Sequence, residues 1–306
     1  MREIEVTANE AGQRLDRYLR KLLPEVALGA IFKLLRRGAI RVDGGKARPD
    51  LRLETGMLLR LPDSVEPVAA PSPGTAAGPL PVRRLLPRVV YRDDALLVVD
   101  KPAGLSVQPG TGHAHDLLDW LGAQPFGVRT ATYRPAPVHR LDRGTSGLLV
   151  IGLTPAASRA LSAAFREDRV QKAYLAVVAG VPEPATGEID APLWLRTTAR
   201  AHQPKVLVDP RGKPARTGYE VLQSGRGRAL LRLVLHTGRT HQLRAHLAHL
   251  GHAIVGDARY GSQIRQRGDG FLLHAAELFL PHPSTGERLA FTTPPPQRLL
   301  DAVQNG

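Results

Sequence analysis

The stretch PVHRLDRGTSGLLV, residues 137–150, combines an isolated acid, a turn and an apolar run. Its single carboxylate, Asp142, stands between Arg140 and Arg143, and the glycine-containing segment that follows leads into residues 148–151, a run typical of a buried strand. A turn beside a core strand can hold a reactive side chain rigidly and still expose it. The flanking cations favour the charged form of Asp142, which could then act as a nucleophile or a base. On these residues alone, the better interpretation is that Asp142 caps the turn and pairs with an arginine at the surface.

Composition and charge limit the class of protein. With 306 residues, 42% of them hydrophobic, the chain is long enough for two domains and a sizeable core. Lys and Arg number 42 against 28 Asp and Glu, a formal net charge of +14, which favours a nucleic acid partner over a merely soluble basic surface. The absence of cysteine excludes disulfides, thiolate zinc sites and cysteine nucleophiles. There is neither the apolar segment of a signal peptide nor an apolar run long enough to span a bilayer, so we expect a cytoplasmic protein.

Residues 12–62 have the pattern of a small folded unit. Apolar residues recur at helical spacing in two segments, and each segment ends at a residue that stops helices. An Asp-Gly pair further along favours a tight turn between short strands. The predicted elements are a helix over residues 15–23 ended by Pro24, a helix over residues 28–37 ended by Gly38, a strand and turn over residues 39–46, and a strand over residues 57–61.

Three basic residues, Lys33, Arg36 and Arg37, lie on the second helix opposite its apolar face. Two short helices with basic outer faces, followed by a small hairpin, resemble the S4 RNA-binding domain in this order. The resemblance implies a small α/β RNA-binding domain over residues 1–62 that uses these three side chains. The alternative is a helix face that is merely solvated.

Residues 62–81 hold six prolines with alanine, glycine and serine, and almost no large apolar side chain. A segment of this composition cannot bury enough apolar surface to offset the entropy lost on ordering. We therefore predict a linker over residues 63–83, which tethers the basic N-terminal unit to a second domain over residues 84–306.

The second domain mixes predicted strands and helices and is assigned to the α+β class. Short apolar and β-branched runs predict the strands, and Thr154 with Pro155 supplies the cap and first-position proline that begin a helix. Residues 182–217 are weakly patterned and are interpreted as hairpins and loops. The predicted strands cover residues 95–100, 148–151, 171–180 and 229–236; one predicted helix covers residues 117–121, and the helix that starts at Pro155 buries Ala157, Ala160, Leu161, Ala164 and Phe165.

Another helix is predicted over residues 240–251, where Thr240 can cap the start and a glycine the end. Three leucines share one face, and Arg244 lies about 100° round from the first of them, Leu243. Arg244 therefore borders the buried face and could reach a carboxylate in a pocket. An arginine whose charged end extends to the solvent is otherwise the commoner case.

Six histidines between residues 236 and 274 raise the question of a metal site. A zinc-binding helix needs two histidines four residues apart and a nearby acid, whereas the helical spacings here are five and three and the glutamate of a metalloprotease helix is missing. Residues 144–147 are one residue short of a hydrolase elbow, and residues 44–46 lack the upstream glycine of a phosphate-binding loop. We predict no metal.

Several stretches, taken together and in this order, resemble the signature motifs of the RluA family of pseudouridine synthases. The resemblance implies a catalytic domain with a mixed, largely antiparallel sheet, flanking helices and a central cleft. It implies an isomerase that converts uridine in RNA to pseudouridine without a metal or other cofactor. An N-terminal S4-like unit accompanies the branch of the family that modifies ribosomal RNA. The matching segments are residues 139–147, 172–176 and 237–246, with residues 99–104 and 256–261 also similar.

The resemblance also assigns roles to individual residues. Asp142 is implied to be the essential carboxylate, acting on the ribose either as a nucleophile or as a base that yields a glycal. Arg244 is implied to be its partner, in place of Arg143. Tyr174 is implied to stack on the target base and is a candidate for proton transfer at carbon 5, while Arg140 is implied to enter the space that a flipped uridine leaves. The remaining implied contacts with the site or the RNA backbone are Arg239, His241 and Gln242.

The implied partner is RNA, with large-subunit ribosomal RNA ahead of transfer RNA, and no obligate protein partner is indicated. Two other classes stay open. An RNA-binding or ribosome-assembly protein could have lost the activity, although the joint presence of Asp142, Tyr174 and Arg244 argues against it. A hydrolase of glycosidic bonds would want a second carboxylate across the scissile bond, where the motif has arginines.

Overall fold

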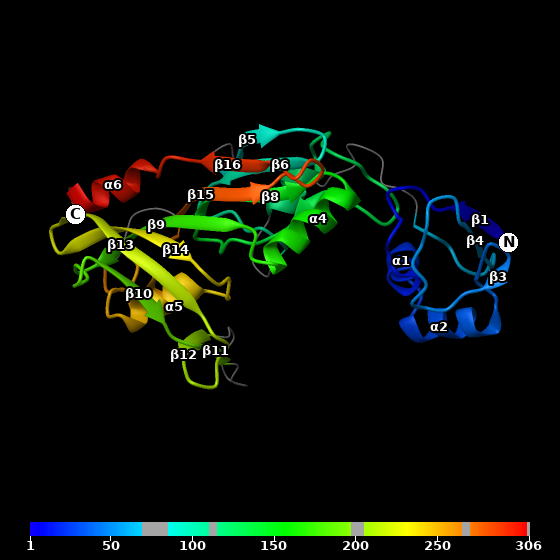
Figure 1. Ribbon diagram of the computed structural model, residues 1–306, viewed down its shortest axis with the longest axis horizontal. Coiled ribbons are helices and arrows are strands. Elements are labelled where there is room, and N and C mark those ends of the chain that lie inside the picture. The colour runs from blue at the N-terminus through cyan, green and yellow to red at the C-terminus, as the bar shows by residue number, and fades with distance from the viewer. Residues whose placement is uncertain (69–84, 110–114, 197–204, 265–269, 305–306) are drawn as a thin grey trace.

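The computed structural model describes residues 1–68, 85–109, 115–196, 205–264 and 270–304. In these residues the strands form a four-stranded sheet near the N-terminus, a ten-stranded sheet further along and a separate two-stranded hairpin. The two larger sheets lie in separate parts of the molecule (Figure 1) and have different hydrophobic cores. No helix among the residues described is long and apolar enough to cross a membrane.

The N-terminal unit folds two helices and a small sheet around one core. Both predicted helices are confirmed, and Gly38 ends the second one with a left-handed φ of 70°. The predicted tight turn is also confirmed, since Asp43 and Gly44 both have positive φ. The first strand was not predicted. The elements are β1 (Arg2–Glu5), α1 (Leu15–Leu22), α2 (Leu28–Arg37), β2 (Arg41–Val42), β3 (Gly45–Lys46) and β4 (Leu58–Leu61), in the sheet order β1-β4-β2-β3.

The chain stays with the N-terminal core beyond residue 62. Val65 is buried in that core, and the backbone N–H of Val68 donates to the carbonyl oxygen of Leu22 at 2.8 Å. The linker predicted from residue 63 therefore starts too early, because apolar contacts and a main-chain hydrogen bond hold residues 63–68. The rest of the predicted linker, residues 69–83, lies outside the described residues.

The large sheet is mixed and largely antiparallel, as the resemblance implied. Its strand order is β10-β13-β14-β9-β15-β8-β6-β5, with β16 paired to β15 and β7 paired to β8. Among the described pairs, β15 and β8 run parallel and the others antiparallel. The strands are β5 (Arg88–Arg92), β6 (Leu96–Lys101), β7 (Ala136–Pro137), β8 (Ser146–Gly152), β9 (Gln171–Ala179), β10 (Thr186–Asp190), β13 (Arg216–Gly225), β14 (Arg228–Leu235), β15 (Leu273–Pro281) and β16 (Arg288–Thr292).

The centre of this sheet is covered on both faces, which explains why its strands read as continuous apolar runs. On β8, Leu149 and Ile151 belong to one core cluster, whereas Leu148 and Val150 belong to another. Side chains of a strand alternate between faces, so each face receives every second residue. The predicted strand over residues 148–151 is thus confirmed as a central one.

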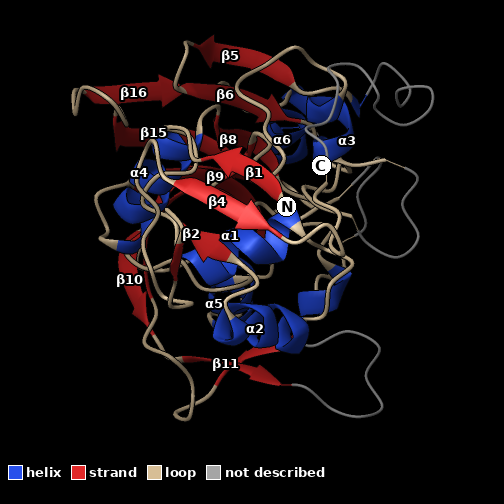
Figure 2. Ribbon diagram, turned by 90° about the vertical axis from the view of Figure 1, so that its right-hand side faces the viewer, coloured by secondary structure: helices blue, strands red, loops and turns tan. Residues whose placement is uncertain are grey.

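Helices pack on both faces. α3 (Leu117–Gly122) and α5 (Gln242–His249) contribute to the first cluster, α4 (Pro155–Arg166) to the second, and α6 (Gln297–Gln304) packs near the ends of β9 and β14. The strands β5, β6 and β8 follow one another down the view in Figure 2. The predicted start of α4 is confirmed: Thr154 caps it, with Pro155 at the first turn. Two residues of its predicted stripe, Ala160 and Phe165, are only half-buried.

The weakly patterned stretch 182–217 contains strands, as predicted for hairpins. β11 (Leu193–Arg196) and β12 (Lys205–Val208) pair with each other apart from the large sheet and pack against α5. Strands β5, β15 and β16, the 3₁₀ turn η2 (Ala258–Tyr260) and helix α6 were not predicted.

Candidate active site

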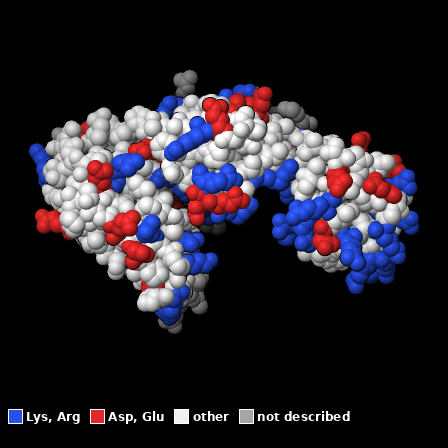
Figure 3. Space-filling model, in the orientation of Figure 1, with Lys and Arg blue, Asp and Glu red and all other residues white. Residues whose placement is uncertain are grey.

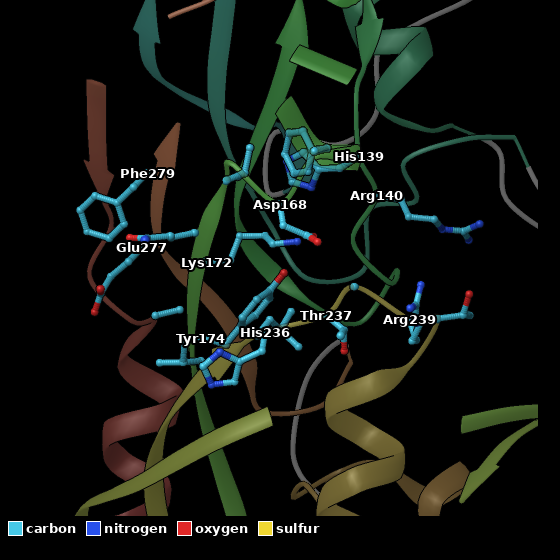
Figure 4. A pocket seen from close by; sticks show the side chains of 18 of the residues that line it. His139, Arg140, Asp168, Lys172, Tyr174, His236, Thr237, Arg239, Glu277 and Phe279 are labelled. Carbon is cyan, nitrogen blue, oxygen red and sulfur yellow. The ribbon is translucent and has the colours of Figure 1, made fainter. Parts of the chain in front are cut away.

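A cavity of about 990 Å³ lies between the loop after β7, strands β9 and β14, and the turn that precedes α5. This volume is at the upper end of the range usual for ligand sites, about 300–1,000 Å³. Figure 4 shows its wall, with Tyr174 rising from β9 and Arg140 and Arg239 on the same side of the view. Of the predicted site residues, those that line the cavity are Arg140, Asp142, Tyr174, Arg239 and His241.

The loop that carries Asp142 is fastened to the loop after β6. Lys101 is fully buried and donates from Nζ to three carbonyl oxygens, that of Arg143 among them at 3.3 Å. The backbone N–H of Gly104 donates to the same carbonyl at 2.8 Å, and Nε of Arg143 donates back to the Gly104 carbonyl at 2.9 Å. Burial lowers the pKa of Lys101 to about 7. The side chain of Arg143 is therefore committed to Gly104, which leaves Asp142 to another partner.

That partner is Arg244, 102 residues further along the chain. Its Nη1 donates to Oδ2 of Asp142 at 2.8 Å, while its Nε and Nη2 donate to the two carboxylate oxygens of Asp257 at 2.7 and 2.9 Å. The side chains of Arg244 and Asp257 are 8% and 2% exposed, and that of Asp142 is 21% exposed. The predicted pairing of Arg244 with Asp142 is confirmed. The role of Asp257 was missed, although it lies in the matched segment 256–261.

The guanidinium group of Arg244 is also enclosed by aromatic rings. Its central carbon lies 4.3 Å from the ring centroid of Phe271 and 4.8 Å from that of Tyr260. Phe271 in turn touches the loop of Asp142, because a Cβ placed on Gly144 would come within 2.8 Å of its ring. Only glycine leaves the loop this close to the ring that supports Arg244.

Helix α5 is buried more completely than predicted. All residues from Gln242 to Leu247 are buried, because one side packs in the main core and the other against the hairpin β11–β12. Arg244 borders the leucine face, as predicted, but the rest of its helix turn is not open to solvent. Thr240 is not the cap either: the helix starts after His241, whose φ of 53° is left-handed and whose side chain makes no capping hydrogen bond.

Gln242, expected to contact RNA or the site, is buried and its amide is fully engaged. Its Oε1 accepts from the hydroxyl of Thr237 at 2.7 Å and from the N–H of Arg239 at 3.0 Å. Its Nε2 donates to the carbonyl of Arg216 at 3.0 Å and to the hydroxyl of Thr217 at 2.9 Å. The expectation was wrong because the protein uses every hydrogen-bonding position of the amide, which holds the turn before α5.

Tyr174 is 7% exposed and lies on β9 between β14 and β15. Its register partners are Leu233 and Ala275, so the ring stands on a rigid part of the sheet. Burial, reinforced by the charge of Asp142, raises the pKa of Tyr174. The phenol is therefore protonated at neutral pH and can donate a proton or a hydrogen bond.

His139 and Lys172 form a second part of the wall that sequence reasoning did not single out. The His139 ring stacks on Phe165 at 4.7 Å between centroids, and its Nε2 accepts from the N–H of Val150 at 3.1 Å. Burial lowers the pKa of His139 to about 3, so the ring is neutral. The ammonium group of Lys172 lies 5.4 Å from the centroid of the same Phe165 ring. A basic residue two positions before Tyr174 was the signal that could have identified this cation.

The three basic residues of α2 lie elsewhere. Lys33, Arg36 and Arg37 are all exposed, as predicted, but they belong to the N-terminal unit and do not line the cavity. In the space-filling view, Lys and Arg gather over this unit (Figure 3). Among the residues that the structure describes, no group of three or more histidines and acids has the geometry of a metal site.

Comparisons with known proteins agree on one family. Residues 95–249 match the family model described as RNA pseudouridylate synthase. The chain is 36% identical to the ribosomal large subunit pseudouridine synthase C of Escherichia coli K12, over 98% of the chain and 95% of that protein, and 34% identical to the protein of the same name from Haemophilus ducreyi, over 94% and 90%. A solved structure of human RNA pseudouridylate synthase domain containing 1 is similar with a TM-score of 0.59 and 28% identity, over 74% of this chain and 98% of that one.

The fold with its mixed sheet and cavity, the family match and the full-length relatives lead to one conclusion. The chain belongs to the RNA pseudouridylate synthase family, and it is an isomerase of that class.

Proposed function

We propose that this protein converts specific uridines of large-subunit ribosomal RNA to pseudouridine. The observation that carries the proposal is the carboxylate of Asp142, held in a cavity by the buried guanidinium group of Arg244. The guanidinium group fixes the position of the carboxylate and balances its charge. The names of the full-length relatives and the formal charge of +14 support ribosomal RNA as the substrate.

The reaction is an isomerisation, in which the bond from ribose carbon 1 to N1 of uracil breaks and a bond from that carbon to C5 forms. The proton on C5 leaves and N1 gains one, so no other reactant is consumed. In our proposal Asp142 acts on the ribose, either attacking carbon 1 or removing a ribose proton. Both routes need an ionised carboxylate with one unoccupied oxygen, and Arg244 binds only Oδ2.

The flipped base would lie on Tyr174. A uridine inside an RNA helix is unreachable, and flipping it out costs a few kcal/mol that contacts with the RNA must offset. Arg140 is exposed at the cavity and is assigned to the space that the base leaves, with Arg239 beside the RNA backbone. C5 loses its proton in the reaction, and in our proposal Tyr174 accepts it after its phenol, protonated in the unliganded enzyme, has passed its own proton to N1 of the detached uracil.

The N-terminal unit, in this proposal, is an S4-like domain that holds the RNA while the second domain works. Its basic outer side chains are the three on α2 and, on α1, Arg17, Arg20 and Lys21, all of them exposed. A domain joined through a segment rich in proline and glycine can bind a distant part of the same RNA.

The test uses ribosomal RNA fragments labelled with tritium at carbon 5 of uridine. Asp142→Asn should abolish tritium release and still bind the RNA, because the amide keeps the size of the side chain and loses its charge. The control is Asp168→Asn, which changes another acid of the cavity wall and should retain activity. Turnover by Asp142→Asn at a rate near that of the wild type would sink the assignment. A nucleoside digest of the treated RNA separates isomerisation from hydrolysis, since hydrolysis would release free uracil.

A further inference from the structure

The two oxygens of the Asp142 carboxylate face different groups. Oδ2 accepts the hydrogen bond from Arg244, and Oδ1 lies 3.6 Å from Nε2 of His241. This distance is longer than a hydrogen bond. Contacts of catalytic groups are often this long before the substrate binds and shorten in the complex. His241 therefore stands at the oxygen that Arg244 leaves unoccupied.

The groups that face the two ring nitrogens of His241 favour one tautomer. The N–H of Val206 donates to the hydroxyl oxygen of Tyr260 at 3.2 Å, and that hydroxyl lies 2.9 Å from Nδ1 of His241. We assign the donor role in this contact to the Tyr260 hydroxyl, because the Asp142 carboxylate that faces the other ring nitrogen, Nε2, can only accept a hydrogen bond. The neutral ring then carries its proton on Nε2, so an N–H group points toward Oδ1 of Asp142.

His241 has an unusual backbone conformation, which is typical of residues at functional sites. His241 has a φ of 53°, a region that residues other than glycine seldom adopt, and it occupies the N-cap position of α5 without making a capping hydrogen bond. The side chain is 15% exposed and meets Tyr260 nearly edge-on, at an interplanar angle of 87°. Strained positions of this kind concentrate at functional sites.

The two side chains that face Asp142, Arg244 and His241, are both bound by residues of the short turn around η2. Asp257, just before η2, binds Arg244, and Tyr260, at its end, binds His241. The turn thus holds two side chains from the start of α5, Arg244 facing Oδ2 of Asp142 and His241 facing Oδ1. The charged or titratable groups around the imidazole are Asp142, Asp257, Arg244, Arg259 and Tyr260.

We propose that His241 is a positioning residue for Asp142: its Nε2–H, fixed by Tyr260, keeps Oδ1 of Asp142 directed at the substrate ribose. The proposal rests on the proposed function and adds a residue to it. Whether Asp142 acts as a nucleophile or as a base, the reacting atom is then Oδ1, since Oδ2 is occupied by Arg244. Misplacement of a reacting atom by about 1 Å can cost about 100-fold in rate.

Two substitutions separate the two nitrogens of the ring. His241→Gln can place an amide N–H near the position of Nε2, whereas His241→Asn is shorter and reaches only the position of Nδ1. Asparagine also tolerates the left-handed backbone well, so a loss of activity in this variant would not come from backbone strain. His249→Asn, an exposed position on the same helix, is the matched control.

The measurement is the single-turnover rate of tritium release, with RNA affinity and thermal unfolding recorded for each variant. We expect His241→Asn to lower the rate by about 10- to 100-fold at nearly unchanged RNA affinity, and His241→Gln to recover most of that loss. Equal rates for His241→Asn and the wild type would overturn the proposal. Equal losses in both His241 variants would overturn it too, because the Nε2 position would then be irrelevant.

Tyr260→Phe tests the chain of hydrogen bonds. If Tyr260 acts through His241, the double variant Tyr260→Phe/His241→Asn should react no more slowly than His241→Asn alone. A further loss of rate that is matched by a loss of thermal stability is ascribed to unfolding. Rate losses that multiply would contradict this coupling. Failure of the proposed function looks different: the wild type itself would then form no pseudouridine in ribosomal RNA.

Discussion

Asp142 and Asp257 both bind the guanidinium group of Arg244, but they differ in the number of hydrogen bonds and in burial. Asp257 takes two of its N–H groups in a bidentate contact and is almost fully buried, whereas Asp142 takes one and remains partly exposed in the cavity. Asp257 thus neutralises and orients the arginine, and the arginine presents a single fixed donor to the carboxylate proposed to react.

Replacing Asp257 should therefore damage stability and activity together. Asp257→Ala leaves the Arg244 charge buried with one carboxylate partner fewer, and removing one member of a buried pair costs about 3–5 kcal/mol of unfolding free energy. We expect this loss in urea unfolding, together with a lower single-turnover rate. Asp63→Asn, at an exposed ion pair with the N-terminus, is the control and should change neither. An unfolding free energy that does not change in Asp257→Ala would contradict the arrangement.

Gly144→Ala should lower the reaction rate while the protein remains folded. The added Cβ would come within 2.8 Å of the Phe271 ring, so the loop must move away from the ring that supports Arg244. A shift of this size displaces Asp142, and we expect about a tenfold slower single turnover at similar RNA affinity.

The control for this substitution is Gly29→Ala on α2. A Cβ there would meet no atom within 4 Å, and alanine favours a helix, so neither rate nor stability should fall. The prediction fails when Gly144→Ala turns over RNA as fast as Gly29→Ala.

The buried histidines predict a protein that loses stability in acid. Burial lowers the pKa of His139 to about 3, and the pKa of His241, His246 and His274 is lowered as well, also by burial first of all. Between about pH 6.5, where these side chains titrate in the unfolded chain, and their lower folded values, the unfolded state binds more protons. The unfolding free energy should therefore fall as the pH drops through this window.

The variant that tests this is His139→Gln, whose amide oxygen can still accept from Val150. It removes one proton-binding group from the unfolded state, so its unfolding free energy should decline less steeply between pH 6 and pH 4 than that of the wild type. The control is His249→Gln, at an exposed position of α5, which should leave the slope unchanged. Parallel pH profiles for wild type and His139→Gln would refute the assignment.

The exposed side chain of Arg36 on α2 should contribute to RNA binding through phosphate alone. Arg36→Gln should weaken binding and reduce the slope of log K against log salt concentration by about 1, with the single-turnover rate at saturating RNA unchanged. Arg226→Gln, an exposed arginine in the turn between β13 and β14, is the control and should keep the wild-type slope. An unchanged slope in Arg36→Gln would remove this helix from the proposed RNA surface.

Local signals in the chain were enough for much of the framework. Helices α1, α2 and α4 were predicted because their starts or ends carry residues with a direct backbone effect, such as Gly38 and Thr154. Strand β8 followed from an uninterrupted apolar run. Strand β1 escaped notice because Arg2–Glu5 has a single apolar residue, Ile4, among exposed charged ones, and becomes a strand only by pairing with β4.

The pairing of Arg244 with Asp142 was expected from the family resemblance, and the reason for it became visible only in the fold. Residues 102 positions apart meet because β8 and α5 pack in one core, which no local pattern encodes. The same packing buries every residue of α5 from Gln242 to Leu247. From its own sequence the helix was expected to have one buried and one solvent-facing side. The hairpin β11–β12, which covers the second side, lies far from the helix in the sequence.

By itself the sequence determined which residues are chemically able to act: an acid between arginines, a tyrosine on a strand and an arginine on a helix. Only the tertiary structure decided how they are held. Asp257 binds Arg244 and Tyr260 binds His241, while Gln242 is buried and hydrogen-bonded within the protein. The physical reason is that composition and periodicity report the environment of a residue along its own element. Hydrogen bonds between side chains depend on where separate elements meet, and that is set by the packing of the whole sheet.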